Sequence, residues 1–400
     1  MTDGVNLNQA GRVAIVGQIE EYENVTVKEV HLNESLLNPG LQTAIVCQNF
    51  VYGKNEFDKL KGREVNFTLV SRKKSQYFDT FKTLDVSQKV YRLDNRQWMP
   101  TNVGQTEEFT LHLCDKSLIE DAKSLVSKSW KCTSPTDIVE YVLGSCARVE
   151  NLIADQSNPS RDYIAENIHP FQVVAQQSNV ALDGDDPSFL HYMTYENRGT
   201  HYFRSLKRLI QAGPVATYTH TETGLLGGKD HNRDPYSVIT FEFPCDFDLL
   251  SDILNGVDEN GININSLMTF NPLNIDFSQI GGMLGGSCGI GSGNAKVSMT
   301  NKGTAGQQNG CETDVESHLL KRQARMGLLE KDKIAFRMVV PWNPDLNVGK
   351  IIRFEWKNKN GDGLVYGSGD YLISSLTHKV LLGGFSTTTV DCITNTFGNS

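Results

Sequence analysis

The chain has 400 residues, of which 39% are hydrophobic and 21% are charged, and its formal net charge is -9 with a pI near 5.5. The length exceeds what one hydrophobic core usually serves, and the composition is that of a folded chain, so we expect two to four domains. The acidic balance argues against a protein that grips nucleic-acid phosphates with a basic face. It does not exclude a protein that lets DNA slide past without binding it.

Targeting and membrane signals are absent from the sequence. The segment from Met1 to Asn6 lacks the basic region and apolar core of a signal peptide. No run approaches the ~20 apolar residues that span a bilayer. We therefore expect a soluble protein made in a cytosol, without stable membrane insertion. None of the cysteines forms a Cys-x-x-Cys pair, and we expect reduced core thiols at Cys47, Cys114, Cys132, Cys146, Cys245, Cys288, Cys311 and Cys392.

Residues 11–115 are expected to form short strands. Val13–Val16 is an apolar run of the buried type, and Leu41–Phe50 is a second one, entered through the turn Asn38–Gly40. Apolar residues alternate at 65, 67 and 69 and again at 109, 111 and 113. Strands at this spacing predict a sandwich or a barrel.

The hydrophobic period then becomes helical. A stripe runs from Leu118 to Trp130. The next helix is expected to begin after the N-cap Ser134, with proline in its first turn. A third begins at Pro170. From Pro187 to Leu209 we expect a strand, a tight turn, a second strand and a short helix from Ser205.

The remaining segments alternate between loops and regular elements. Residues 224–235 are expected to form a loop, followed by a strand over 238–243 and a helix over 246–254. Residues 281–310 are rich in glycine and are expected to form a mobile excursion, and 315–329 an amphipathic helix. Strands then return, and a final hairpin over 371–380 and 386–394 turns at Gly383-Gly384.

Two segments far apart in the chain share a pattern. Gly62–Phe67 and Gly349–Phe354 each have a glycine, a base and then alternating apolar residues. Each is followed by a last strand that contains threonine and ends in cysteine, over 110–114 and 387–392. We interpret this as a duplicated β unit, one copy at each end of the chain, with chance alternation of strands as the alternative. A trimer of such subunits would present six similar units around an axis, and pairing of their edge strands would close a ring.

Three signatures carry a resemblance to a known family. The stretch Pro187–Leu209, the stretch Trp342–Ile352 and the final hairpin from Ser368 to Val390 are similar to baseplate hub proteins of contractile-tailed phages, the late-control-D type of tail protein. The resemblance implies an α+β fold with two tail-tube-like antiparallel β-barrel domains joined by a mixed helical and β insertion. The implied domains are an N-terminal barrel (1–115), a helical and mixed middle domain (116–235) and a second barrel (236–262 with 312–400). The glycine-rich excursion (263–311) that interrupts the second barrel has no counterpart in the family, and its role stays open.

The resemblance also implies a function. It predicts a structural hub subunit that forms a homotrimeric ring, joins the tail tube to the central spike and lines a channel for DNA. The implied partners are the spike protein, the tube or tube-initiator protein and other baseplate wedge proteins, while DNA passes through the lumen without specific binding. An acidic lumen would suit such a channel. The implied location is the virion tail baseplate, assembled in the host cytoplasm, with no enzyme activity, cofactor, metal or catalytic residue.

Several short motifs suggest chemistry that would compete with this expectation. Gly285–Gly289 matches the Gly-x-Ser-x-Gly elbow around Ser287, but its neighbours are glycines instead of a strand and a helix. Gly224–Lys229 is one residue short of a phosphate loop and lacks the following Ser or Thr, and Gly289–Gly291 lacks the third glycine of a dinucleotide fingerprint. Asp230, His231 and Asp234 form a charged loop more readily than a cation site.

Other polar groups have plain structural explanations. His201 and His378 are expected to be strand residues with hydrogen-bonded rings, and Arg204, Lys207 and Arg208 a solvated helix face, with a binding patch as the alternative. Three other functions stay open. The chain could be the equivalent spike-base protein of a phage-like secretion or injection machine, a hydrolase using Ser287 or a Cys/His pair, or a sugar-binding module.

Overall fold

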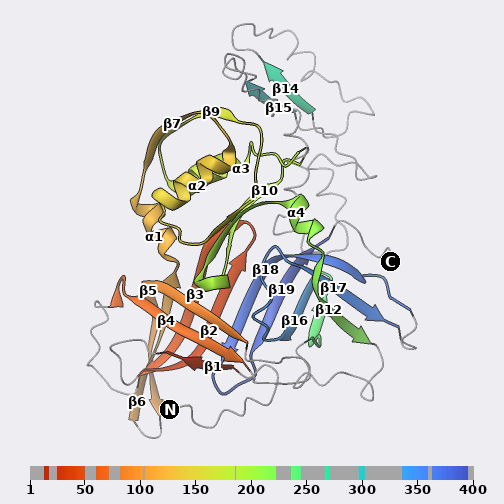
Figure 1. Cartoon of the computed structure of the whole chain (residues 1–400). Helices are drawn as coiled ribbons and strands as arrows, with labels where there is room; N and C mark the ends of the chain where they lie inside the picture. The colour runs from red at the N-terminus through yellow and green to blue at the C-terminus, as the bar shows by residue number, and fades with distance from the viewer. Residues whose placement is uncertain are drawn as a thin grey trace, which may run out of the picture.

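A computed structural model describes residues 13–17, 25–49, 60–71, 82–101, 104–184, 186–221, 236–244, 266–270, 297–301, 336–358 and 363–394. Within these ranges the protein is mainly antiparallel β structure with four short α-helices (Figure 1). None of the helices in this part of the chain is long and apolar enough to span a bilayer. The expected α+β class is therefore weighted strongly towards β.

Six strands form the N-terminal unit. Their bounds are β1 (Val13–Val16), β2 (Val25–Ser35), β3 (Asn38–Asn49), β4 (Glu64–Ser71), β5 (Thr83–Thr101) and β6 (Gly104–Cys114). They lie in the order β1-β4-β5-β6-β3-β2, each antiparallel to its neighbour. The alternating apolar residues meet in one cluster that includes Val30, Ile45, Phe67, Leu69 and Leu111. The alternation predicted for β4 and β6 is thus confirmed.

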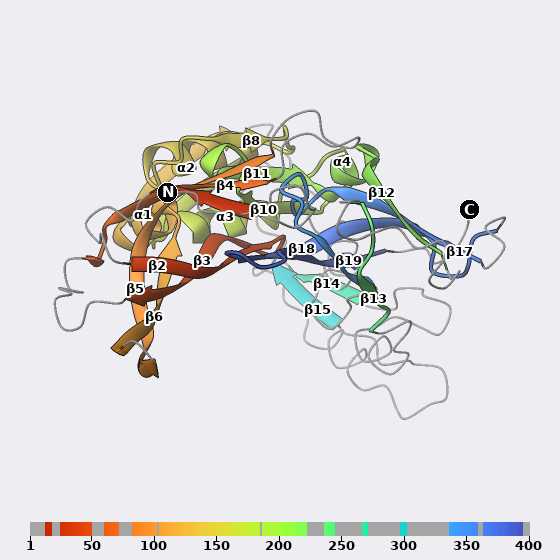
Figure 2. The ribbon, with the colours of Figure 1, turned by 90° about the horizontal axis from the view of Figure 1, so that it is seen from below.

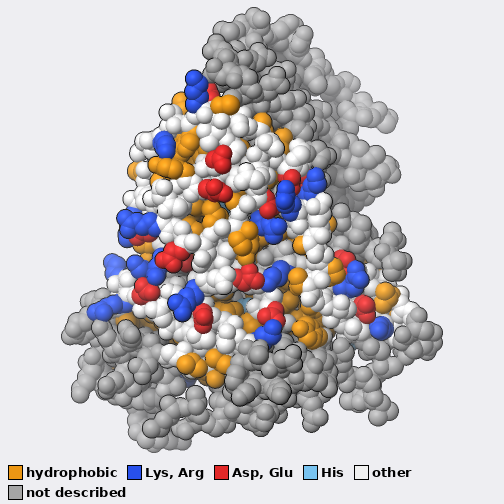
Figure 3. Space-filling view, viewed as in Figure 1, with side chains coloured by type: hydrophobic (Ala, Val, Ile, Leu, Met, Phe, Trp, Pro, Cys, Tyr) orange, Lys and Arg blue, Asp and Glu red, His pale blue; other side chains and the backbone are white. Residues whose placement is uncertain are grey.

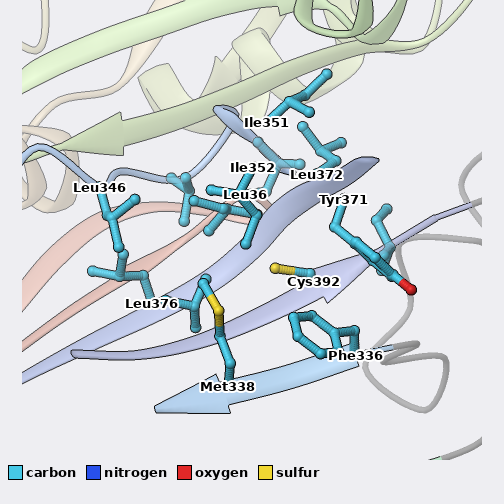
Figure 4. Close-up of a cluster of buried hydrophobic side chains, with 14 of the residues drawn as sticks. Leu36, Phe336, Met338, Leu346, Ile351, Ile352, Tyr371, Leu372, Leu376 and Cys392 are labelled. Atoms are coloured by element: carbon cyan, nitrogen blue, oxygen red, sulfur yellow. The ribbon is translucent and has the colours of Figure 1, made fainter. Parts of the chain in front are cut away.

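Six strands form the C-terminal unit. Their bounds are β12 (Pro214–Thr221), β13 (Thr240–Glu242), β16 (Phe336–Pro341), β17 (Ile351–Lys357), β18 (Gly369–Leu381) and β19 (Thr387–Ile393). The order is β18-β19-β16-β13, and β17 pairs with β18 and, in parallel, with β12. Figure 4 shows the second hydrophobic cluster, which includes Phe336, Met338, Ile352, Tyr371 and Cys392.

The two units share one sheet. β2 pairs antiparallel with β18, from Ser35 opposite Ser375 to Glu29 opposite Leu381. Figures 1 and 2 show the N-terminal strands on one side of this junction and the C-terminal strands on the other. Leu36, at the end of β2, is fully buried in the C-terminal cluster beside Ile352 (Figure 4). Among the described residues the strands form this continuous sheet and close no barrel, so the two-barrel arrangement stays a prediction.

The strand order supports the predicted internal repeat. The N-terminal order β2-β3-β6-β5-β4 corresponds to β13-β16-β19-β18-β17 in the C-terminal unit. The register corresponds as well, because Glu64 faces Lys89 and Ile351 faces Leu372 at matching positions. Both units also carry an irregularity at the same place, after Val90 in β5 and after Ile373 in β18. A chance similarity of strands would not explain why the strand order, the pairing register and the position of the bulge all correspond.

The two glycines of the repeat perform the same local task. Gly62 and Gly349 both have positive φ, of 76° and 81°, which favours glycine. The N–H of Gly62 donates to the carbonyl of Val90 at 2.8 Å, and the N–H of Gly349 donates to the carbonyl of Ile373 at 3.0 Å. The glycine pattern in the sequence therefore marks one turn that is used twice.

A middle unit lies between the two halves of the sheet in sequence, and in Figure 1 its helices α1, α2 and α3 lie above the N-terminal strands. Its elements are α1 (Lys116–Lys123), β7 (Val126–Thr133), α2 (Pro135–Ser145), β8 (Leu152–Ala154), β9 (Arg161–Ile168), α3 (Pro170–Ser178), β10 (Phe189–Thr194), η2 (Glu196–Arg198), β11 (Thr200–Ser205) and α4 (Leu206–Gln211). β7 pairs with β9, and β10, β11 and β8 form a three-stranded sheet. α2 and α3 pack in a third cluster with Val142, Val173, Phe189 and Phe203.

Several expectations for local structure are confirmed. Ser134 caps α2, where its hydroxyl accepts a hydrogen bond from the N–H of Asp137. Ser205 caps α4 in the same way through the N–H of Arg208. The strand, turn, strand and helix expected over 187–209 are β10, η2, β11 and α4. The final hairpin is β18 and β19.

Two expectations for local structure are wrong, and one strand is longer than expected. The stripe to Trp130 is a helix only to Lys123, because β7 follows and pairs with β9. The turn expected at Asn38–Gly40 lies earlier in the chain, because Asn38 is already the first residue of β3 and pairs with Ser35. The short strands expected over 11–115 include β5, which is long at 19 residues and in which Leu84, Val86 and Val90 alternate with polar residues.

Some expectations cannot be compared with the structure. The loop over 224–235 and the helices over 246–254 and 315–329 lie outside the described residues. The same holds for the glycine-rich segment 281–310, apart from β15 (Val297–Asn301), which pairs in parallel with β14 (Ser266–Phe270). The domain boundaries at 115, 235, 262 and 311 stay a prediction.

Candidate functional site

The continuous sheet has one buried face and one polar face. In β2, Val30, Leu32 and Glu34 are buried, while His31 and Asn33 point to the opposite side and are partly or fully exposed. This period of two follows from the pleat of a strand. The pairing of β2 with β18 keeps the two units in phase, so that the polar side continues from one unit to the other.

Three transverse rows define the polar face, because residues that pair directly across strands point to the same side. The first row is Thr240, Val339, Thr389, Thr377, Asn33 and Gln42. The second row is Thr387, Lys379, His31, Ala44, His112 and Arg92. The third row is Glu242, Arg337, Asp391, Ser375 and Ser35. Hydroxyls, amides and ion pairs therefore dominate this surface.

Each of four basic side chains on the polar face contacts an acidic one. The pairs are Lys28 with Glu108, Arg92 with Asp94 at 2.7 Å, Arg337 with Asp391 at 2.6 Å and Lys379 with Glu29 at 2.8 Å. The hydrogen bond from Arg337 to Asp391 also raises the pKa of the guanidinium. Figure 3 shows the same mixing, with acidic and basic side chains next to one another across the visible described surface. The face is polar and charge-balanced.

Glu34 joins the three units at the buried side of the sheet. Its side chain is 2% exposed. One carboxylate oxygen accepts from the N–H of Tyr195 at 2.8 Å and from Nδ2 of Asn347 at 3.3 Å. The other accepts from the N–H of Val348 at 2.9 Å. One carboxylate on β2 thereby holds the end of β10 and the segment before β17.

Burial dominates the ionisation of this carboxyl group. Desolvation raises the pKa of Glu34 to about 7, although hydrogen bonds from Tyr195, Val348 and Asn347 and the charge of Lys350 act in the opposite direction. Glu34 is therefore an ionisable joint between the units. Neither the residues next to Glu34 in the sequence nor its place in an alternating strand predicts this role.

A second polar contact lies beside this joint. Nζ of Lys350 is 2.7 Å from Oε1 of Glu196, and the hydroxyl of Tyr202 donates to Oε2 of Glu196 at 2.5 Å. Lys82 of the N-terminal unit pairs with Asp345 at 2.6 Å. The signature Trp342–Ile352 therefore forms the buried connection between the three units.

A cavity of about 560 Å³ lies between the N-terminal unit and the middle unit. Its lining includes Asp115, Ser117 and His201, three residues that are nearly fully buried. The hydroxyl of Ser117 donates to Oδ1 of Asp115 at 2.5 Å, and Nε2 of His201 is 3.0 Å from the same hydroxyl. Nδ1 of His201 is 3.1 Å from Nε2 of His191.

The directions of these hydrogen bonds argue against a nucleophilic serine. The Ser117 hydroxyl gives its proton to a carboxylate oxygen, so Nε2 of His201 must donate to Ser117 instead of accepting from it. Burial lowers the pKa of His201 to about 3, which makes the ring a poor general base near neutral pH. Asp115 also accepts from the N–H of Ser117 and caps α1. The cluster orders the start of that helix.

The structure places some of the candidate residues and not others. His201 lies in β11 and His378 in β18, both buried, and Nδ1 of His378 is 2.9 Å from the hydroxyl of Thr388, as expected for hydrogen-bonded strand residues. Arg204 belongs to β11 and pairs with Asp155, so it is not part of a helix face. The remaining motif residues lie outside the described ranges: Ser287, Gly224–Lys229, Gly285–Gly291, Asp230, His231 and Asp234.

The cysteines follow the expectation in part. Cys47, Cys114, Cys146 and Cys392 are free thiols, and burial raises the pKa of Cys47 to about 12. Cys132 is disulfide-bonded, so the expectation of a reduced thiol is wrong at this position. It lies on the exposed strand β7, where its neighbours did not signal a covalent partner. Within the described ranges, no group of three or more His, Cys, Asp or Glu side chains is placed to hold a metal ion.

Comparison with known proteins identifies the fold. No family model matches the sequence, and no curated protein matches it. The tail protein from Neisseria meningitidis MC58 superposes with a TM-score of 0.56 at 10% identity, covering 97% of this chain and 97% of that protein. The 43 kDa tail protein of prophage MuSo2 from Shewanella oneidensis superposes with a TM-score of 0.50 at 9% identity, covering 93% and 97%. The chain therefore has the fold of these tail proteins, which confirms the resemblance at the level of the fold.

Proposed function

We propose that the chain is a structural subunit of the baseplate hub of a contractile phage tail. Three copies form a ring that connects the tail tube to the central spike, and the lumen of the ring passes DNA. The observation that carries this proposal is the continuous sheet, built from two repeated units, with an unbroken polar face. The likeness to two tail proteins supports a place in a tail.

The repeat explains how one chain could fit two symmetries. Because each subunit carries two units of the same strand order, a cyclic trimer would offer six similar positions around its axis. Such a ring would match a sixfold tube on one side and a threefold spike on the other.

The polar face is the surface that suits the lumen. It offers hydroxyl, amide and paired charged groups, and four of its bases are held by acids of the same face. A duplex moving along the described part of such a wall would find these four cations already in contact with carboxylates. The face that we assign to the lumen mixes acids and bases, whereas the resemblance led us to expect an acidic lumen. The role is structural, and the partners are the spike, the tube or tube-initiator and the wedge proteins.

The native mass of the purified chain, measured by light scattering over a range of concentrations, tests the proposal. A trimer with a threefold ring in electron micrographs is the expected result. A monomer at every concentration, in the presence of the cognate tube and spike proteins as well, contradicts it. A hexamer or an open filament would contradict the symmetry argument.

A further inference from the structure

Four bases of the polar face are restrained by acids that lie deeper in the surface. In the four pairs the acidic side chains are between 17% and 25% exposed, whereas the basic ones are between 39% and 63% exposed. The acids are therefore fixed beside the strands, and the bases fold back over them. Each cation remains accessible to solvent but has a carboxylate within contact distance.

Three of the four pairs join different strands, and one of these three joins the two units. Glu29 of β2 holds Lys379 of β18 at 2.8 Å, on either side of the junction between the two units. Glu29 also contacts Nε2 of His31 at 2.7 Å. Burial opposes the charge of Glu29, but hydrogen bonds and charges of Lys379 and His31 lower its pKa. The carboxylate thus stays ionised beside its cation near neutral pH.

An exposed ion pair adds little to stability, roughly 0–1 kcal/mol. Its effect on a polyanion is larger, because affinity for DNA depends on how many phosphates find an unpaired cation. Including Glu242, which contacts Arg337 at 3.0 Å, these contacts set five acids against four bases of the face. Without these acids the same four bases would be cations without an acidic partner, distributed over both units.

We propose that the acids of this face mask its bases from nucleic-acid phosphates, and that the masking keeps the wall from retaining double-stranded DNA. The proposal deepens the proposed function, on which its biological meaning rests. It assigns a role to acidic side chains that touch no ligand themselves. The same residues that balance the charge of the sheet decide whether DNA can move along it.

The test is a variant in which three masking acids become amides of the same shape, Glu29→Gln, Glu108→Gln and Asp391→Asn. A matched control neutralises three exposed acids of the middle unit, Glu140→Gln, Glu150→Gln and Glu166→Gln, and changes the net charge equally. Binding is measured by fluorescence anisotropy with a labelled duplex of about 30 base pairs at about 50 mM salt.

The face variant is expected to bind the duplex with micromolar affinity, and the wild type and the control variant are not. If about three phosphates are contacted, raising salt from about 50 to 200 mM should weaken binding about 40-fold. Adding Lys28→Gln, Arg337→Gln and Lys379→Gln to the face variant should abolish binding, which would place it on this face. Should the triple variant fail to fold, Glu29→Gln alone is expected to give weaker binding with the same salt dependence.

Three results would overturn the proposal: DNA binding by the wild type, equal binding by the control variant, or no binding by a face variant that is folded. The native mass of the wild type reports separately on the ring. A trimer whose face variant does not bind DNA would therefore reject the masking and leave the hub assignment intact. A monomer whose face variant binds DNA would support the masking and reject the ring.

Discussion

The carboxylate of Glu34 accepts a hydrogen bond from the backbone N–H of Val348 at 2.9 Å, although the two residues are 314 positions apart in the chain. The contact joins the first unit of the repeat to the segment that begins the second. Tyr195 of the middle unit donates to the same carboxylate. The relative placement of the three units thus depends on one buried acid.

Replacing Glu34 by alanine should destabilise the protein strongly. The N–H groups of Tyr195 and Val348 would remain buried without an acceptor, at about 1–3 kcal/mol each. We expect a loss on the order of 3 kcal/mol in the free energy of unfolding, measured by urea titration. Asn33→Ala, one residue earlier on the exposed side of β2, is the control and should cost less than about 1 kcal/mol. Equal losses of stability in the two variants would contradict the role of Glu34 as the joint between the units.

The raised pKa of Glu34, about 7 in the folded protein against 4.5 ordinarily, predicts a pH dependence. Between these values the unfolded chain loses this proton first, so stability from this group is full below about pH 4.5 and is lost as the pH rises through 7. The loss should approach about 3 kcal/mol. Subtracting the pH profile of Glu34→Gln from that of the wild type isolates the effect, and parallel profiles would refute it.

Buried His378 should act in the opposite direction. Desolvation lowers its pKa from 6.5 to about 3, so the unfolded chain binds this proton at a higher pH than the folded protein does. Stability from this group is present above about pH 6.5 and falls by about 1.4 kcal/mol per unit as the pH is lowered towards 3. His378→Asn should flatten this acid limb in denaturation experiments. Adding His201→Asn, whose ring has a similarly lowered pKa, should flatten it further, and an unchanged limb in both variants would count against the assignment.

Much of the fold could be predicted because local signals agreed with the final structure. Ser134 with Pro135 marked the start of α2, and the repeated glycines marked equivalent turns at Gly62 and Gly349. β7 was missed because the apolar residues up to Trp130 fit a helical period, and only pairing with β9 decides for a strand. In β5 apolar residues alternate only as far as Val90, since two bulges then shift the register.

The candidate site was less predictable than the fold. The polar face consists of ordinary Thr, Asn and Ser residues, and their common surface appears only when β2 pairs with β18. The role of Glu34 depends on donors from Tyr195 and Val348, which no local pattern connects to β2. Long-range pairing thus decides what these residues do, whereas the sequence pattern predicts mainly the strand to which each residue belongs.

The equivalent glycines offer a comparison within one molecule. Both have positive φ, so alanine at either position should cost about 1 kcal/mol of backbone strain. A Cβ at Gly62 would meet nothing within 4 Å, whereas a Cβ at Gly349 would lie 2.7 Å from the hydroxyl oxygen of Tyr192. Because Tyr192 is buried and stacks on Tyr202 at 5.0 Å between ring centroids, it cannot move away freely.

Gly349→Ala should therefore destabilise the protein by about 1–3 kcal/mol more than Gly62→Ala, because overpacking adds to strain. Thermal and urea unfolding of the two variants measure the difference directly. The comparison needs no further control, since the turn, its hydrogen bond and its place in the repeat are the same in both units. Equal destabilisation would show that Tyr192 yields to the new methyl group, and that the middle unit is packed more loosely on the C-terminal unit than the contacts of Gly349 indicate.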